Sequence, residues 1–242
     1  MDLKELALVD PRTHWYYQSK LAGIRRILGP VLQRMTTIVD VGAGSGFFSI
    51  ALASELSDAR VICIDPNYED LDAIQQDDVR FVRHANSEDL AAADAMLFID
   101  VLEHVDDAQG LLQSYVNSAK SGCFMVISVP AFMSLWSPHD EFLEHKHRYT
   151  LQEIEGLARS TGLRVVRGRY LFASIVGPVW ASRRLRRSQP PASDLKPVPR
   201  WINQLLKSIT SLEHRVTSTR VAGLSAVVLA EVTLDERRDS DR

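Results

Sequence analysis

The chain contains 242 residues, of which 45% are hydrophobic, and it carries a formal net charge of −3 at neutral pH. This length and composition suffice for one α/β domain with a substantial core, and the net charge gives no reason to expect nucleic acid as a ligand. The longest apolar run, residues 171–181, argues against a membrane-spanning helix, because spanning a bilayer requires about 20 apolar residues.

The cysteines and the first residues predict a cytoplasmic location. Cys63 and Cys123 lie in apolar runs that we interpret as buried strands, without the spacing of a disulfide framework. Residues 1–11 are charged and lack the apolar segment of a secretory signal. Together these features favour a reducing, intracellular compartment.

The charges are unevenly distributed along the chain. Acidic residues outnumber basic ones between residues 65 and 107, whereas residues 156–193 contain several arginines and no acidic residue. The second segment predicts a basic surface, either simply solvated or available to an acidic partner, a phosphate or an anionic lipid.

Helical and strand periodicities alternate along the chain. We predict helices over residues 14–31, 47–56, 68–76, 106–119 and 201–216, and strands over residues 37–41, 60–65, 79–83, 95–99, 123–129, 163–172 and 224–232. Thr150 and Glu153 form a capping-box pattern that begins a further helix, and Gly162 suits its end. Because the strands are almost continuously apolar, the alternation predicts a mostly parallel sheet with helices on both faces.

The chain is expected to form a single domain, residues 1–242, with several parts. These are an N-terminal helix in 12–35, a core in 36–172, a helical insertion or cap in 173–220, a last strand in 221–234 and a disordered charged tail in 235–242. Residues 171–187 are apolar and then rich in arginine. They are expected either to cap a ligand pocket or to lie peripherally in a membrane interface, and we favour the cap.

A glycine-rich turn follows the first predicted strand. Residues 39–46 are Val-Asp-Val-Gly-Ala-Gly-Ser-Gly and lead directly into a helix. Glycines let the backbone pass close to a ligand, and the helix N-terminus offers free N–H donors. Asp65, at the tip of the next strand, is placed to accept both hydroxyls of a ribose. The pattern predicts a nucleoside-containing ligand.

Two kinds of nucleoside ligand compete for this turn. A dinucleotide fingerprint has the spacing G-x-G-x-x-G, whereas this chain has G-x-G-x-G and places Phe47 at the dinucleotide glycine position. Asp40 would also bring a negative charge close to a pyrophosphate, and the repulsion between like charges disfavours a dinucleotide. S-adenosylmethionine has no phosphate and carries an ammonium and a sulfonium, so an acidic pocket favours it over NAD(P).

Three segments in combination resemble the class I methyltransferases: Asp40 to Gly46, Asp65-Pro66 and Asp100 to Val105. Residues 136–141, Trp-Ser-Pro-His-Asp-Glu, and 148–150, Arg-Tyr-Thr, look like a bacterial small-molecule branch of that superfamily. The resemblance implies a three-layer, Rossmann-like fold with a mostly parallel seven-stranded sheet and an antiparallel last strand. It also implies an S-adenosylmethionine-dependent methyltransferase of small-molecule metabolism.

The same resemblance places the cofactor along the strand tips. The methionine end would lie against Asp40, Gly42, Ala43, Gly44 and Gly46, with Lys20 near its carboxylate; the ribose against Asp65 and Pro66; the adenine against Asn86 and Ser87; and the sulfonium against Asp100 and Val101.

The acceptor is expected at the carboxyl ends of the same strands, where such sheets bind their ligands. His104 and His139 follow the fourth and fifth core strands and are candidate general bases, since an imidazole titrates near neutral pH. The alternative is structural: His104 would orient its loop, and His139 would lie in a helix start capped by Ser137. Candidate substrate-binding residues are Tyr16, Tyr17, Trp136 and Glu141.

Three histidines, His139, His145 and His147, raise the question of a metal. Their spacing matches neither a helical His pair nor a zinc ribbon, and no cysteine lies nearby in the sequence. We therefore predict no metal site.

The function predicted from the sequence is in-line transfer of a methyl group to a hydroxyl, amine or thiol of a small molecule. The alternatives are an NAD(P)-dependent Rossmann enzyme and a protein that binds the cofactor without catalysis. A base-flipping N-P-P-[YF] motif, which a nucleic-acid methyltransferase typically needs, does not occur in the sequence.

Overall fold

The computed structural model describes residues 3–6, 8–68, 75–76, 78–186, 188–216 and 220–233. Its strands form one sheet in the order β3-β4-β2-β1-β5-β6-β8-β7. Their bounds are β1 Thr37–Val41, β2 Arg60–Ile64, β3 Gln75–Gln76, β4 Val79–Val82, β5 Ala95–Ile99, β6 Phe124–Pro130, β7 Leu163–Leu171 and β8 Ser225–Val232. Among the described strands, β8 runs antiparallel to both β6 and β7, the two-residue β3 runs antiparallel to β4, and the other pairings are parallel. The predicted seven-stranded sheet with an antiparallel last strand is confirmed, and β3 adds a short edge.

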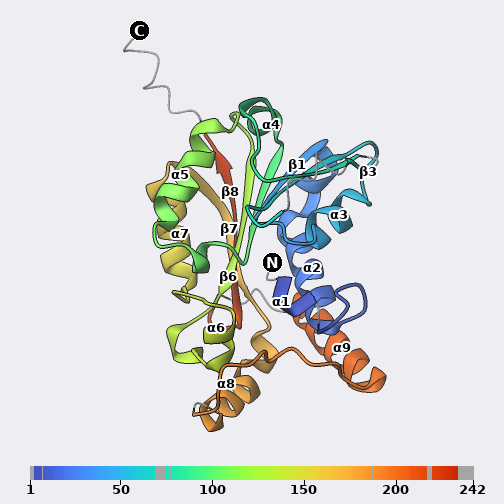
Figure 1. Cartoon of the computed structure of the whole chain (residues 1–242), viewed down its shortest axis with the longest axis vertical. Helices are drawn as coiled ribbons and strands as arrows, with labels where there is room; N and C mark the ends of the chain where they lie inside the picture. The colour runs from blue at the N-terminus through green and yellow to red at the C-terminus, as the bar shows by residue number, and fades with distance from the viewer. Residues whose placement is uncertain are drawn as a thin grey trace.

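Helices cover both faces of the sheet (Figure 1). The α-helices are α1 Leu3–Leu6, α2 Trp15–Leu28, α3 Phe47–Ala53, α4 Ser87–Ala92, α5 Ala108–Ser118, α6 Pro138–Phe142, α7 Leu151–Ser160, α8 Val176–Leu185 and α9 Arg200–Val216. Short 3-10 helices are η1 Gly29–Arg34, η2 Leu102–His104, η3 Met133–Leu135 and η4 Ala173–Ile175. α2 and α3 lie on one face, and α5 and α7 lie on the other.

The central strand β5 shows why its sequence is apolar at every position. Met96 and Phe98 pack in the core under α5 and α7, whereas Leu97 packs in the core under α2 and α3. All five residues of the strand are buried. A strand covered on both faces needs this continuous apolar run.

The helix predicted over residues 68–76 is wrong at its end, which the structure describes as a strand. The sequence predicted a helix over residues 68–76, but Gln75–Gln76 pair with β4 as a strand. Residues 69–74 lie outside the described residues, as does the predicted disordered tail 235–242. The predicted helix over 14–31 ends as an α-helix at Leu28, because Gly29 adopts a positive φ of 55° and Pro30 follows it.

The insertion between β7 and β8 is anchored to the first long helix. The Ser19 and Thr210 hydroxyls lie 2.7 Å apart, and the Trp15 N–H donates to Asn203 Oδ1 at 2.7 Å. Glu213 accepts from the backbone N–H groups of residues 173 and 174, both at 2.9 Å. α9 therefore runs along α2, and α8 lies across the end of the sheet (Figure 1).

Candidate active site

The sheet reverses its strand order between β1 and β5, because β2 and β4 lie on one side of β1 and β5 and β6 lie on the other. Ligands of open α/β sheets bind at the carboxyl ends of the strands around such a point. Three acids occupy this region: Asp40 within β1, Asp65 after β2 and Asp100 after β5. The fold thus gathers the carboxylates that the sequence assigned to the cofactor.

The glycine turn after β1 needs its glycines for geometry. Gly42, Gly44 and Gly46 have φ values of 65°, 56° and 70°. A Cβ on Gly42 would lie 2.7 Å from Val101 Cγ2, so the turn also packs directly against the loop that follows β5. Residues other than glycine are strained at positive φ, and the contact with Val101 leaves no space for a side chain at position 42.

Asp65, at the tip of β2, stabilises this turn by accepting hydrogen bonds. Its Oδ2 accepts from the Gly44 N–H at 3.0 Å, and its Oδ1 accepts from the backbone and side-chain N–H groups of Asn67 at 2.9 and 3.0 Å. The Tyr68 hydroxyl donates to the Gly44 carbonyl at 2.6 Å. A carboxylate has about four acceptor positions, so Asp65 retains capacity for a further donor. Pro66 follows it at the surface.

Asp40 is buried, as is Asp65. It accepts from the Ser49 hydroxyl at 2.6 Å, and burial raises its pKa to about 6. The Ser45 hydroxyl in the same turn is buried and has no hydrogen-bond partner among the described residues. An orphaned polar group in a glycine turn, beside acids at adjacent strand tips, fits a cationic nucleoside such as S-adenosylmethionine.

Asp100 occupies a strained backbone position, with φ of 55°. The Lys20 ammonium, fully buried, lies 2.6 and 2.5 Å from its two carboxylate oxygens. Burial works against both charges, but their mutual attraction outweighs it, lowering the pKa of Asp100 and raising that of Lys20. Strain of this kind in a non-glycine residue is characteristic of functional sites. The role predicted for Lys20 at the cofactor carboxylate stays a prediction, since in the structure it binds Asp100.

Asn86 and Ser87 begin α4. Asn86 is the N-cap, and its Oδ1 accepts from the Asp89 N–H at 2.8 Å. Both residues are exposed. The predicted contact with adenine would have to use the second lone pair of the Asn86 carbonyl.

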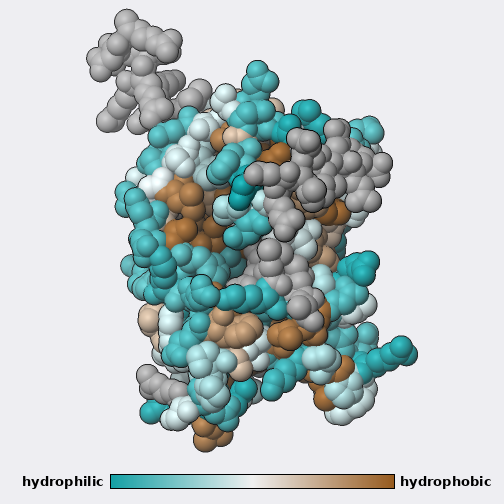
Figure 2. Space-filling model, in the orientation of Figure 1, coloured by the Kyte–Doolittle hydropathy of each residue, from teal (hydrophilic) through white to brown (hydrophobic). Residues whose placement is uncertain are grey.

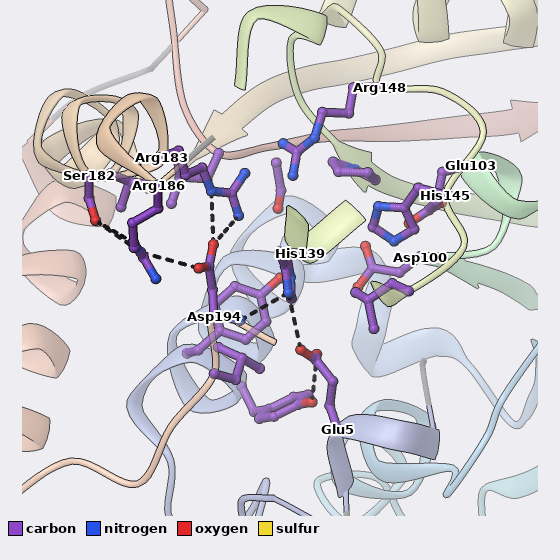
Figure 3. Close-up of a pocket in the computed structure, with 18 of the residues that line it drawn as sticks. Glu5, Asp100, Glu103, His139, His145, Arg148, Ser182, Arg183, Arg186 and Asp194 are labelled. Atoms are coloured by element: carbon purple, nitrogen blue, oxygen red, sulfur yellow. Dashed lines mark hydrogen bonds and ion pairs between the residues drawn. The ribbon is translucent and has the colours of Figure 1, made fainter. Parts of the chain in front are cut away.

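A cavity of about 310 Å³ adjoins Asp100 and extends beneath the insertion (Figure 3). Five of the residues predicted from the sequence line it: Tyr16, Tyr17, Asp100, His104 and His139. Two predicted substrate residues, Trp136 and Glu141, are described in the structure but do not line this cavity, and Glu141 is exposed.

His139 faces the cavity as a neutral ring. The backbone N–H of Asp194 donates to its Nδ1 at 3.1 Å, which puts the proton of the neutral imidazole on Nε2. Burial lowers the pKa of His139 to about 4, and the neighbouring Arg183 acts in the same direction. The ring is therefore placed to donate a hydrogen bond, and its predicted role as a base stays a prediction.

The Ser-Pro-His-Asp segment is organised around Asp140. The predicted capping box is present, with the Ser137 N–H donating to Asp140 Oδ2 at 2.9 Å. Asp140 Oδ1 also accepts from Arg148 Nε at 2.6 Å and lies 2.8 Å from His145 Nδ1. Although Asp140 is buried, these partners hold its pKa well below the ordinary range. Arg148 and His145 both line the cavity.

The insertion and α1 close the opposite side of the cavity. Asp194 accepts from Arg183 Nε at 2.9 Å and lies 3.2 Å from Arg186. Glu5 accepts from the Ser193 hydroxyl at 2.7 Å and lies near the Tyr17 hydroxyl at 3.4 Å. Figure 3 shows Asp194 and Glu5 on either side of His139.

Sequence reasoning missed several of the residues lining the cavity. They are Glu5, Glu103, His145, Arg148, Arg183, Arg186 and Asp194. Glu103 and Arg148 lie in segments that carried the family resemblance, and that signal was available. Glu5 and Asp194 lie in segments with no recognisable motif, so only the fold reveals them.

Comparison with known protein families identifies one whose sequence model covers more than half of the chain. The sequence model of the Methyltransferase domain family matches residues 13–167. No functionally curated protein matches the chain.

Solved structures share the fold at low sequence identity. The partner of the Haloferax volcanii Trm112 methyltransferase activator is 18% identical with a TM-score of 0.59, over 97% of this chain and 94% of that one. An S-adenosylmethionine-dependent methyltransferase from Archaeoglobus fulgidus is 17% identical with a TM-score of 0.57, over 95% and 98%. A phosphoethanolamine N-methyltransferase from Haemonchus contortus, solved with S-adenosylhomocysteine, is 16% identical with a TM-score of 0.54, over 89% and 53%. At these identities the likeness concerns the fold alone.

Proposed function

Since the chain belongs to the Methyltransferase domain family, and is thus an S-adenosylmethionine-dependent methyltransferase, we propose that its acceptor is a small molecule bearing a hydroxyl, amine or thiol. The observation that carries this proposal is the cavity of about 310 Å³ that adjoins Asp100 and is covered by α8 and the segment after it. Its volume lies at the lower end of the range for small-ligand pockets, about 300–1,000 Å³. A covered pocket of this size suits a metabolite rather than a folded macromolecule.

The strand tips fit the cofactor by their chemistry. S-adenosylmethionine supplies a methyl group on a positively charged sulfur. Asp40 and the glycine turn would bind its methionine end, and Asp65 its ribose. Asp100, fixed by Lys20, would place a negative charge near the sulfonium.

The aromatic residues of α2 connect the cofactor side to the acceptor side. Tyr16 lines the cavity, stacks on Phe172 with ring centroids 5.2 Å apart, and lies 5.7 Å from the Lys20 ammonium. Rigid walls of this kind restrict how an acceptor can lie relative to the methyl group. Positioning alone can supply about 7–11 kcal/mol of the barrier reduction in such a displacement.

His104 is the better placed of the two candidate bases. It lines the cavity in η2, directly after the loop that bears Asp100. His139 has its Nδ1 already engaged and would donate to the acceptor instead. If His104 removes a proton from the acceptor, the step gains about 10²–10⁴-fold in rate.

The test is release of S-adenosylhomocysteine by the purified full chain. A bacterial extract is separated by size into metabolites, RNA and proteins, and each fraction is offered with S-adenosylmethionine. Release with the metabolite fraction, reduced in His104→Ala but with unchanged cofactor affinity, supports the proposal. Release with the RNA or protein fraction alone would overturn it.

The predicted membrane contact of residues 171–187 and the cytoplasmic location stay predictions. No helix among the described residues has the length and apolar character needed to cross a bilayer. Apolar side chains do reach the surface over α8 and α9 at the lower end of the molecule (Figure 2), including Trp180, Leu185, Trp201 and Leu205.

A further inference from the structure

Two loops at one side of the cavity bring together a carboxylate and two imidazoles. Glu103 and His104 belong to η2 after β5, and His145 lies in the loop after α6. One ligand atom of each lies within 4.8 Å of those of the other two. Figure 3 shows Glu103 and His145 next to each other, beside Asp100 and away from Arg183 and Arg186.

The carboxylate of Glu103 has no hydrogen-bond partner among the described residues. The residue is 0% exposed, and neither carboxylate oxygen has a hydrogen-bond partner in the described part of the chain. Leaving a buried polar group unsatisfied costs about 1–3 kcal/mol, and more for a charged one. Such a group within a cluster of ligand atoms points to a bound species that satisfies it.

His145 is oriented in the way that protein metal ligands usually are. Its Nδ1 lies 2.8 Å from Asp140 Oδ1, which leaves Nε2 for another partner. A metal-bound histidine almost always directs its second nitrogen to a carboxylate, carbonyl or water, which fixes the ring. Asp140 is itself fixed by Arg148 at 2.6 Å.

The backbone ties the two ligand-bearing loops together. The Lys146 N–H donates to the Glu103 carbonyl at 2.7 Å, and the Tyr149 hydroxyl donates to the Leu102 carbonyl at 3.2 Å. The rings of His104 and His145 lie edge to face with their centroids 4.9 Å apart. The two hydrogen bonds to the carbonyls of η2 thus join the loops without using the side chains of Glu103, His104 or His145.

We propose that Glu103, His104 and His145 bind one divalent first-row transition metal ion. Two imidazole nitrogens and one carboxylate form a face of three ligands that leaves positions open, and nitrogen donors favour such metals over Mg²⁺ and Ca²⁺. The absence of a metal predicted from the sequence concerned His139, His145 and His147. The fold instead joins His145 to the Glu-His pair of another loop.

The role of the ion rests on the proposed function. An acceptor hydroxyl that coordinates an open position loses its proton to solvent more readily, because the cation lowers its pKa. The acceptor oxygen then forms a bond to the methyl carbon while the carbon–sulfur bond breaks, and that electron pair stays on sulfur as neutral S-adenosylhomocysteine. In this arrangement the ion takes over the activation otherwise assigned to His104 as a base.

The binding test uses Co²⁺ added to the chelator-treated full chain, without cofactor or acceptor. We expect one equivalent to bind, seen by visible absorption of the ion and by calorimetry, with a rise in Tm. Glu103→Gln, which preserves the shape, and His145→Ala should lose this binding. Asp140→Asn should weaken it about 10–100-fold. His147→Ala is the matched control, since it lies two residues from His145 in ring contact with Tyr149 and outside the cluster.

Failure of the wild type to bind one equivalent would overturn the site, as would equal binding by Glu103→Gln. Glu103→Gln also shows whether the fold survives, because without metal its Tm should equal or exceed that of the wild type. The role in transfer is judged separately. Activity that persists after chelation would overturn that role, whereas stoichiometric Co²⁺ binding without turnover of any metabolite would retain the site and overturn the proposed function.

Discussion

The two halves of the active site are built in different ways. The cofactor half consists of strand tips, and each of its acids lies within or directly after a buried strand: Asp40, Asp65 and Asp100. The acceptor half joins α1, α2, η2, α6 and the insertion around one cavity. The first half is local to the core fold, whereas the second joins segments far apart in the chain: the Ser193 hydroxyl donates to Glu5, and the Asp194 N–H donates to His139. The halves should therefore respond differently to mutation.

The largest expected effect tests the acceptor half. Asp140→Ala would leave the buried guanidinium of Arg148, 3% exposed, without its carboxylate. Removing one partner of a buried pair costs about 3–5 kcal/mol. We expect that loss in the free energy of unfolding, measured with urea, together with loss of acceptor turnover.

The control for this variant is Asp106→Ala. Asp106 forms an ion pair with Lys146 but is 88% exposed, so its removal should change stability by less than about 1 kcal/mol. Similar losses in the two variants would show that the Asp140 network does not stabilise the acceptor half.

The second prediction tests the cofactor half. Asp65→Ala should weaken binding of S-adenosylhomocysteine by about tenfold to a hundredfold, since hydrogen bonds to a charged group contribute about 1.5–3 kcal/mol. Calorimetry measures the affinity, and Asp78→Ala, which removes an exposed carboxylate just before β4, is the control. Unchanged affinity in Asp65→Ala would remove its ribose role.

How far the sequence predicts each half follows from this difference. The glycine turn and Asp65 directly follow strongly apolar strands, so their places can be predicted from those apolar runs in the sequence. Arg148 and His145 become site residues only because Asp140 binds them, and they lie in the irregular loop after α6, where no helix or strand periodicity indicates their direction.

Among the helices with no range predicted from the sequence, α4 and α8 were missed for separate reasons, although α8 falls within the predicted helical insertion. α4 has six residues and none of them is buried, so it carries no apolar stripe. α8 contains Gly177 and Pro178, which are ordinarily taken to interrupt a helix. Pro178 falls in the first turn, however, where its missing N–H would have no helical partner.

The third prediction concerns pH and again the acceptor half. The pKa of His139 falls from an ordinary value near 6.5 to about 4 in the folded protein. The unfolded chain therefore binds a proton that the folded chain does not, so stability is lost as the pH falls from about 6.5 towards 4. Between pH 7 and pH 5 this amounts to about 2 kcal/mol.

Urea unfolding of the wild type and of His139→Gln at both pH values measures this contribution. The variant should lose less stability than the wild type by that amount. A pH dependence that is the same in both proteins would mean that His139 titrates normally and is not enclosed by Asp194 and the insertion.

The smallest effect separates two roles of Asn86 in the cofactor half. As the N-cap of α4 it should contribute about 1 kcal/mol, which Asn86→Ala removes and Asn86→Ser largely retains, because serine also caps helices. A contact with adenine would instead be lost in both variants, since the serine side chain is shorter. We expect Asn86→Ser to keep its Tm and to bind S-adenosylhomocysteine several-fold more weakly, consistent with one neutral hydrogen bond of about 0.5–1.5 kcal/mol. If its affinity equals that of the wild type, Asn86 serves only to cap the helix, and other residues bind the adenine.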